Sequence, residues 1–396
     1  MAIADWTVLI AYLVGTVLLG VILGRLVKNS SDMFSAGGTS PWWASGLSAF
    51  MTMFSANTFV VWGSIAFDVG MVAVMINLMY GVAALLVGVF VAGRWKGMGI
   101  ETPAEYVRLR FGKGALHFYT WSMMVLRVVG TAAALYALAK ILVALMPLDE
   151  GNMLRDPETG NLSLRWAILI FGSVVVLYTM IGGLWAVLMT DVLQFIILNL
   201  AVLFVVPLAL HQVGGLGGFI EAAPEGFFDL VKEEKYSVFF LAGWAAIHFF
   251  MIGAEWAFVQ RFLCVPTKKD ARKSTFLFAA LYLCSPLLWL LPPMIYRVSN
   301  PGADAEQAYI LACQSVLPIG MVGLMLAAMF SATASMVSSQ LNVFSGVLTH
   351  DIYKPLAKAS TAKSLLRAGR IFTVLLGILL IGIALQIEKL GQVKDL

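Results

Sequence analysis

Long apolar runs recur along the whole chain, and they constrain its fold more than any other feature. About ten of them approach the roughly 20 residues that a helix needs to cross a bilayer. They lie at approximately 6–24, 42–67, 71–93, 115–147, 166–181, 186–210, 237–260, 274–296, 308–348 and 371–387. The chain is 60% hydrophobic and 12% charged, with a mean hydropathy of +0.89, whereas soluble domains are about 45–50% apolar and about 25% charged. The sequence therefore predicts an all-α, multi-pass membrane protein that contacts the lipid bilayer.

Basic residues gather in every second loop between these runs. Lys and Arg cluster at about 25–28, 94–113, 261–273 and 354–370, and the loops between these clusters are mainly acidic. Loops rich in Lys and Arg face the cytoplasm by the positive-inside rule. We therefore expect a protein of the cell membrane with its N-terminus outside. The net charge of +4 reflects this topology, and it does not predict nucleic acid as a partner.

Sequence signatures of catalysis are missing. The four His residues show no HxxH or HExxH spacing, and no GxSxG motif or phosphate-binding glycine loop occurs. The three Cys residues are odd in number and give no disulfide framework. No loop has the length of a second domain. We therefore predict that the chain is not an enzyme.

One apolar run is unusually rich in hydroxyl groups. If it is helical, Ser335, Ser338 and Ser339 are spaced i, i+3, i+4 and share a face, with Ala332 one turn earlier on the same side. Such a face can bind a small hard cation, or it can pack closely against a neighbouring helix and form hydrogen bonds with it. These residues alone support both interpretations.

Other polar residues lie within apolar runs, where they are costly and often mark a pathway. Asp191 lies near the start of a run, where it either binds a ligand or caps the helix. Arg127 and Glu255 either line a pathway or simply pair with each other. Asn77 and His248 are more typical of contacts between helices than of ligands.

Four segments resemble the motifs of one known family. Residues 182–194, with the sequence GGLWAVLMTDVLQ, are similar to the signature of the sodium:solute symporter family, and residues 327–353 are similar to its sodium-site helix. Residues 37–48 resemble the entry to the first core helix, and residues 259–262 resemble the end of the sixth. The similarity runs from about residue 5 to 390 in the order and spacing of the family.

This resemblance implies the leucine-transporter fold, in which an extra N-terminal helix precedes two inverted repeats of five helices. One transporter domain, 1–396, would contain the extra helix at 5–30, the first repeat at 42–212 and an incomplete second repeat at 236–390. Only four of the five spans of the second repeat are present among the apolar runs. We therefore expect the tenth core helix to be missing and the chain to be truncated after residue 396. Ligands would bind at mid-membrane beside broken helices, with breaks near 51–57 and 251–255.

The resemblance also implies two sodium sites. The first would use four groups, namely the backbone carbonyls of Met51, Phe54 and Ala332 and the side chain of Ser335. Met336 occupies a position where the family commonly has a second hydroxyl, and its thioether is a poor ligand for a hard cation. The second site would combine the carboxylate of Asp191 with the hydroxyls of Ser335, Ser338 and Ser339.

The implied contacts with the solute are polar residues near the broken helices: Ser55, Thr58, Asn77, Arg127 and Glu255. Arg127 lies close to the position where carboxylate-binding members have an arginine, which favours an acidic or zwitterionic solute. If Glu255 neutralises Arg127 within the fold, the solute is instead neutral.

Together these features predict sodium-coupled secondary active symport of a small organic solute by alternating access. Two alternatives stay open. The chain is a transporter-like sensor module of a larger signalling protein, or it is a proton-coupled carrier in which Asp191 or Glu255 titrates.

Overall fold

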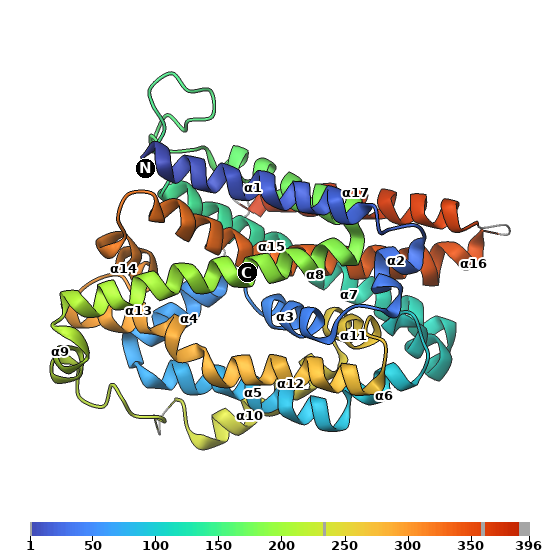
Figure 1. Ribbon diagram of the computed structural model, residues 1–396, viewed down its shortest axis with the longest axis horizontal. Helices are drawn as coiled ribbons and strands as arrows, with labels where there is room; N and C mark the ends of the chain where they lie inside the picture. Colours follow the sequence, from blue (N-terminus) through green and yellow to red (C-terminus); the bar gives the residue numbers. More distant parts are fainter. Residues whose placement is uncertain (1, 233–234, 358–360, 388–396) are drawn as a thin grey trace.

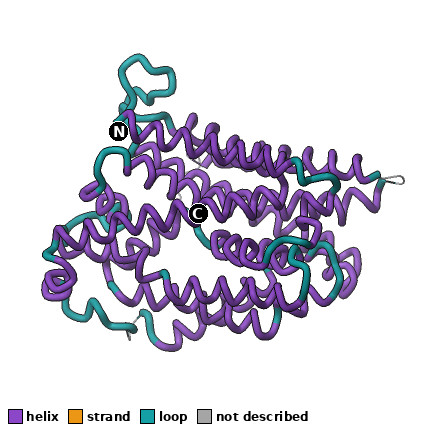
Figure 2. Tube along the Cα trace, viewed as in Figure 1, coloured by secondary structure: helices purple, strands orange, loops and turns teal. Residues whose placement is uncertain are grey.

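The computed structural model describes residues 2–232, 235–357 and 361–387, and these residues are almost entirely helical (Figure 2). Within these ranges no β-strand forms, and pairing is limited to three isolated bridges. The structure therefore confirms the predicted all-α class.

The N-terminal half consists of a long first helix, a short helical entry segment and then a series of further helices. These elements are α1 (Ile3–Gly24), α2 (Ser30–Ser35), the 3-10 helix η1 (Ala36–Gly38), α3 (Trp42–Thr52), α4 (Ala56–Val69), α5 (Met71–Phe90), α6 (Ala92–Gly97), α7 (Pro103–Ala144) and α8 (Leu164–Gln212).

The C-terminal half begins after α8 and includes a π-helix, η2, that directly continues one of its long helices. Its elements are α9 (Gly215–Ala222), α10 (Val238–Ala254), α11 (Trp256–Leu263), α12 (Lys268–Cys284), α13 (Pro286–Ser299), α14 (Ala308–Val316), α15 (Met321–Val347), η2 (Leu348–Tyr353), α16 (Lys354–Leu356) and α17 (Ala362–Ile387). The second repeat was predicted at 236–390, of which residues 388–390 lie outside the described residues.

Two helices are broken at the predicted positions. The first break separates α3, which ends at Thr52, from α4, which begins at Ala56. The second lies at Glu255, whose extended backbone (φ −66°, ψ 134°) separates α10 from α11 with a bend of 55°. Backbone groups freed at such breaks have no partner in their own helix, so they are available to ligands or neighbouring side chains.

A glycine divides the longest helix, α8. Its 49 residues would extend for about 74 Å as a straight helix, more than twice the ~30 Å hydrocarbon layer. At Gly183 the backbone adopts φ 54°, ψ −147°, a conformation that is readily accessible only to glycine. A Cβ there would lie 2.6 Å from the carbonyl oxygen of Met33 on α2. The spans predicted at 166–181 and 186–210 are therefore the two arms of α8.

Counting spans by helix length gives fewer than the ten expected. Among the described residues, seven helices are long and apolar enough to cross a membrane, and the bent pair α10–α11 makes eight. The remaining difference comes from the broken pair α3–α4 and from the two arms of α8. The span predicted over 308–348 also divides, because Pro318 and Gly320 (φ 92°) separate α14 from α15.

The serine-rich helix α15 lies at the centre of the molecule. In its most apolar stretch 78% of the residues are buried, compared with 22% in α1. Helices α1, α15 and α17 lie side by side in the upper part of Figure 1, and α5, α10 and α12 pack together in the lower part. Helix α3 contacts α8, α11, α12 and α15 and so connects the two groups.

The first helix is attached to the start of α15. The Oδ1 of the buried Asp5 accepts hydrogen bonds from the backbone N–H groups of Gly320 (2.8 Å) and Gly323 (3.0 Å). Further along α15, the hydroxyl of Ser331 donates to that of Tyr12 on α1 at 2.7 Å. A carboxylate at a helix N-terminus satisfies free N–H groups and favours the helix dipole, so α1 caps α15.

Candidate functional site

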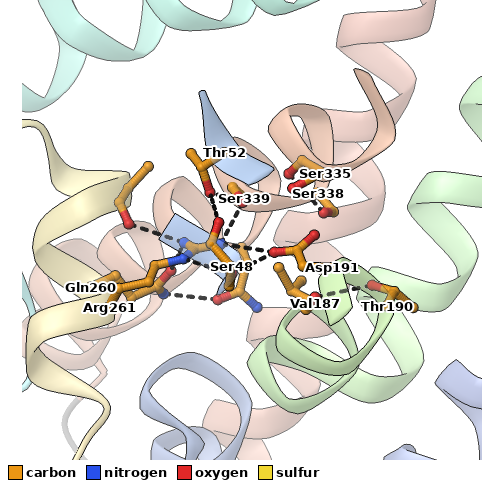
Figure 3. Close-up of polar contacts among 12 residues, drawn as sticks. Ser48, Thr52, Val187, Thr190, Asp191, Gln260, Arg261, Ser335, Ser338 and Ser339 are labelled. Atoms are coloured by element: carbon orange, nitrogen blue, oxygen red, sulfur yellow. Dashed lines mark hydrogen bonds and ion pairs between the residues drawn. The ribbon is translucent and has the colours of Figure 1, made fainter. Parts of the chain in front are cut away.

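The carboxylate of Asp191 on α8 faces the serines of α15 in a fully buried site (Figure 3). Ser335, Ser338 and Ser339 have no exposed surface, and neither has Asp191. Asp191 lies about two turns beyond the kink at Gly183, so the interpretation that it caps the start of a helix is wrong.

Two oxygens of this site lack hydrogen bonds. The Oδ2 of Asp191 accepts a short hydrogen bond from the hydroxyl of Ser48 on α3. Among the described residues, the Oδ1 of Asp191 and the Oγ of Ser335 have no partner with acceptable hydrogen-bond geometry, although Ser335 lies next to the carboxylate. Buried polar atoms almost always have partners, so this pair of oxygens requires an explanation.

The other two serines of the face are already engaged. The hydroxyl of Ser338 donates to the backbone carbonyl of Ser335 at 3.0 Å. The hydroxyl of Ser339 accepts from Arg261 at 2.5 Å and lies 3.3 Å from the hydroxyl of Thr52. The predicted face therefore has one free hydroxyl, one turned to the backbone and one bound to an arginine.

Arg261 is the principal residue of this site that the sequence did not reveal. Its place before a run of Lys residues predicts a cytoplasmic loop, but it lies on α11 with no exposed surface. Its Nη2 is 3.8 Å from the Oδ2 of Asp191, and its Nε donates to Ser48 at 3.1 Å. Its Nη1 donates to the carbonyl of Ala257 at 3.0 Å and to Gln260 at 3.1 Å. The guanidinium thus neutralises the buried carboxylate.

The residues predicted for the first sodium site are buried around the break in α3–α4. Met51, Phe54 and Ala332 have no exposed surface, and α3 and α15 are in contact. The carbonyl of Met51 accepts a hydrogen bond from the N–H of Phe54 at 3.0 Å. The ring of Phe54 packs edge-on against that of Trp289, with the ring centroids 4.4 Å apart. Met336 is half-buried. The role of these residues as sodium ligands stays a prediction.

Arg127 and Glu255 form an ion pair, with Nη2 and Oε2 at 3.3 Å. The pairing interpretation is therefore confirmed. Glu255 also accepts from the side-chain amide of Gln340 at 2.8 Å. The two charged residues line a cavity of about 200 Å³ at the break between α10 and α11, together with residues such as Tyr119 and Trp256. Part of the arginine remains accessible, with 38% of its side chain exposed compared with 12% for the glutamate.

The other predicted solute contacts are not among the residues that line this cavity. The N–H of Ser55 donates to the hydroxyl of Thr58 at 3.3 Å at the start of α4. The amide of Asn77 donates to the carbonyl of Ala73 in its own helix at 2.9 Å, and the side chain is buried. Their predicted contact with a solute stays a prediction.

Comparison with known proteins gives consistent matches over nearly the whole chain. The family model described as the sodium:solute symporter family matches residues 33–396. The sodium/sialic acid symporter NanT of Aliivibrio fischeri is 27% identical over 95% of this chain and 75% of its own length. The sodium/glucose cotransporter of Vibrio parahaemolyticus is 26% identical over 92% of this chain and 71% of its own length.

A solved structure shares the fold. It is the substrate-bound outward-open state of a Na⁺-coupled sialic acid symporter, and it superposes with a TM-score of 0.86 at 23% identity. The match covers 98% of this chain and 83% of that one, and it confirms the predicted leucine-transporter-like architecture.

Proposed function

The chain belongs to the sodium:solute symporter family, and from this premise we propose where sodium and solute bind and how their transport is coupled. The protein is a multi-pass membrane transporter that couples the movement of a solute to sodium. Membership confirms the predictions that it is a transporter rather than an enzyme and that Na⁺ is the coupling ion. Alternating access through the two repeats, 42–212 and 236–390, is the proposed mechanism.

Sodium binds between α8 and α15, at Asp191, Ser335 and Ser338. The observation that carries this proposal is the pair of buried oxygens without hydrogen-bond partners, the Oδ1 of Asp191 and the Oγ of Ser335. Hard cations prefer oxygen ligands, and a carboxylate offsets the cost of removing water from the ion. Ser339 joins the site only if Arg261 releases it, because Arg261 donates to its hydroxyl.

A second, weaker sodium site is proposed at the break between α3 and α4. Its ligands would be the carbonyls of Met51, Phe54 and Ala332 with the hydroxyl of Ser335. Met336 supplies a thioether next to this site, where a hydroxyl would bind a hard cation better. The site at Asp191 is therefore proposed to be the main coupling position.

The solute is proposed to be a small carboxylic acid whose acidic end enters the cavity at Arg127. A guanidinium presents a planar pair of donors that matches a carboxylate, and two relatives are named as symporters of sialic acid. The cavity of about 200 Å³ is below the ~300–1,000 Å³ of most ligand sites, so it accommodates the acidic group rather than a whole large solute. A neutral solute is the alternative, favoured by the pairing of Arg127 with Glu255.

We further propose a location in the cell membrane with the N-terminus outside. The support is the alternation of basic and acidic loops. Arg261 is removed from that count because it is buried, and the Lys residues that follow it preserve the pattern.

Transport by proteoliposomes tests these proposals. Uptake of sialic acid and of glucose is measured under an inward sodium gradient and, separately, under an inward proton gradient. We expect sodium to drive uptake of the acid, and we expect Asp191→Asn to lose sodium stimulation while the exposed control Asp68→Asn keeps it. Wild-type sodium dependence in folded Asp191→Asn would contradict the site. Uptake driven by protons alone would instead support a proton-coupled carrier.

A further inference from the structure

Four buried or half-buried charges of alternating sign connect the proposed sodium site to the proposed solute cavity. Asp191 pairs with Arg261 at 3.8 Å, and Glu255 pairs with Arg127 at 3.3 Å. The two pairs are linked through α11, because Glu255 is the N-cap residue of this helix and Arg261 lies within it. The sequence of charges is therefore carboxylate, guanidinium, carboxylate, guanidinium.

Helix α15 holds the two pairs side by side through neighbouring residues. Ser339 accepts a hydrogen bond from Arg261 at 2.5 Å. The next residue, Gln340, donates to Glu255 at 2.8 Å. Arg261 and Glu255 themselves belong to α11 and to the break that precedes it. The partners of Arg261 and Glu255 on α15 are therefore adjacent in the chain.

Sodium and the guanidinium compete for the same carboxylate. Asp191 has no exposed surface, so water does not screen the repulsion between two cations beside it. Sodium at Asp191 would therefore favour withdrawal of Arg261. Glu255 is the carboxylate at the start of the same helix, and its partner Gln340 is adjacent in the chain to Ser339, the partner of Arg261. When Glu255 also pairs with Arg261, it attracts Arg127 less strongly. Arg127 is then free to bind the carboxylate of a solute.

We propose that Arg261 and Glu255 transmit sodium binding to the solute cavity by exchanging partners along this four-charge chain. The proposal rests on the sodium site at Asp191 and deepens it, since it explains how sodium raises affinity for an acidic solute. Coupling of this kind is reciprocal, so the solute must raise sodium affinity by the same factor.

Sodium affinity, read as the sodium-dependent rise in thermal stability, tests the proposal without any solute. Arg127→Gln leaves Glu255 free to receive Arg261, and we expect it to raise apparent sodium affinity about five-fold or more. Glu255→Gln removes that acceptor while keeping an oxygen for Gln340, and we expect it to lower sodium affinity by a similar factor. Lys140→Gln removes an exposed positive charge from the same helix, α7, and should change nothing.

The double variant separates partner exchange from a general electrostatic effect. In the Glu255→Gln background, Arg127→Gln should no longer raise sodium affinity, because its effect passes through Glu255. Simple repulsion at a distance predicts additive changes instead, and additivity would overturn the proposal. If Asp191→Asn keeps the sodium response, the proposed sodium site itself fails. If Asp191→Asn loses the sodium response and the effects of Arg127→Gln and Glu255→Gln are additive, the sodium site at Asp191 is supported. Only the exchange of partners is then rejected.

Discussion

The pair formed by Asp191 and Arg261 determines the charge balance of the proposed sodium site. Both side chains are completely buried, and each nitrogen of the guanidinium that could donate has an oxygen near it. Breaking a buried pair by removing one partner leaves an uncompensated charge, which is far more costly than losing an exposed pair. Sodium at the proposed site would be a second way to compensate the same carboxylate.

Removal of Arg261 should therefore make stability depend on sodium. We expect Arg261→Gln to lose about 3–5 kcal/mol in a sodium-free buffer, and to recover more stability on addition of sodium than the wild type gains. Thermal unfolding in sodium and in choline measures both quantities. Arg261→Lys keeps the charge and serves as the control. An equal sodium response in Arg261→Gln and wild type would show that the ion does not bind at Asp191.

Met336 offers a second test at a single side chain. Met336→Ser adds a hard oxygen beside the proposed site at the break between α3 and α4, so apparent sodium affinity or the number of ions coupled per solute should rise. Because Met336 is only half-buried, the cost in stability should fall at or below the low end of the ~2–5 kcal/mol for fully buried methionines. Sodium titration of solute binding measures the first effect. An unchanged titration in a stable variant would mean that Met336 serves only packing.

At the scale of elements, the kink in α8 positions the carboxylate. The arm that follows Gly183 carries Asp191, and the kink also admits the backbone of α2 at Met33. The orientation of this arm relative to α15 therefore depends on one residue with positive φ.

Gly183→Ala should disrupt this geometry. The strained backbone conformation alone costs about 1–3 kcal/mol for a residue with a side chain, and the contact of 2.6 Å with the carbonyl of Met33 adds to it. Gly243→Ala is a matched control, because its Cβ would meet no atom within 4 Å inside the helix α10. We expect a lower unfolding temperature and weaker sodium affinity in Gly183→Ala only. Similar stability of the two variants would show that α8 tolerates another geometry.

At the scale of the whole molecule, topology decides which side each end of the pathway faces. Met153 lies in the loop between α7 and α8 and is 91% exposed, and Leu109 near the start of α7 is 69% exposed. In a background without the exposed Cys284, Met153→Cys should react with an impermeant maleimide on intact cells. Leu109→Cys should react only after permeabilisation. The reverse pattern would place the N-terminus inside.

Local spacing predicted the serine face, because residues at i, i+3 and i+4 share one side of a helix. The two helix breaks were implied by the resemblance to the family. The ion pair between Arg127 and Glu255 was only one of two interpretations, since no local pattern determines a contact across 128 positions. Arg261 was assigned to a loop because it precedes a run of Lys residues. Its burial results from the packing of α11 against α3 and α15, which is a tertiary property.

The attachment of α1 to α15 has a practical consequence. Asp5 binds the first N–H groups of the helix that carries Ser335, and the N–H of Ala2 donates to the same carboxylate at 2.8 Å. Ala2 and Asp5 are thus joined by hydrogen bonds to the start of α15, the central helix of the transporter. A purification tag or fluorescent reporter fused directly before Ala2 would disturb these hydrogen bonds. Labels that must not affect transport are better placed elsewhere, for example in the exposed loop around Met153.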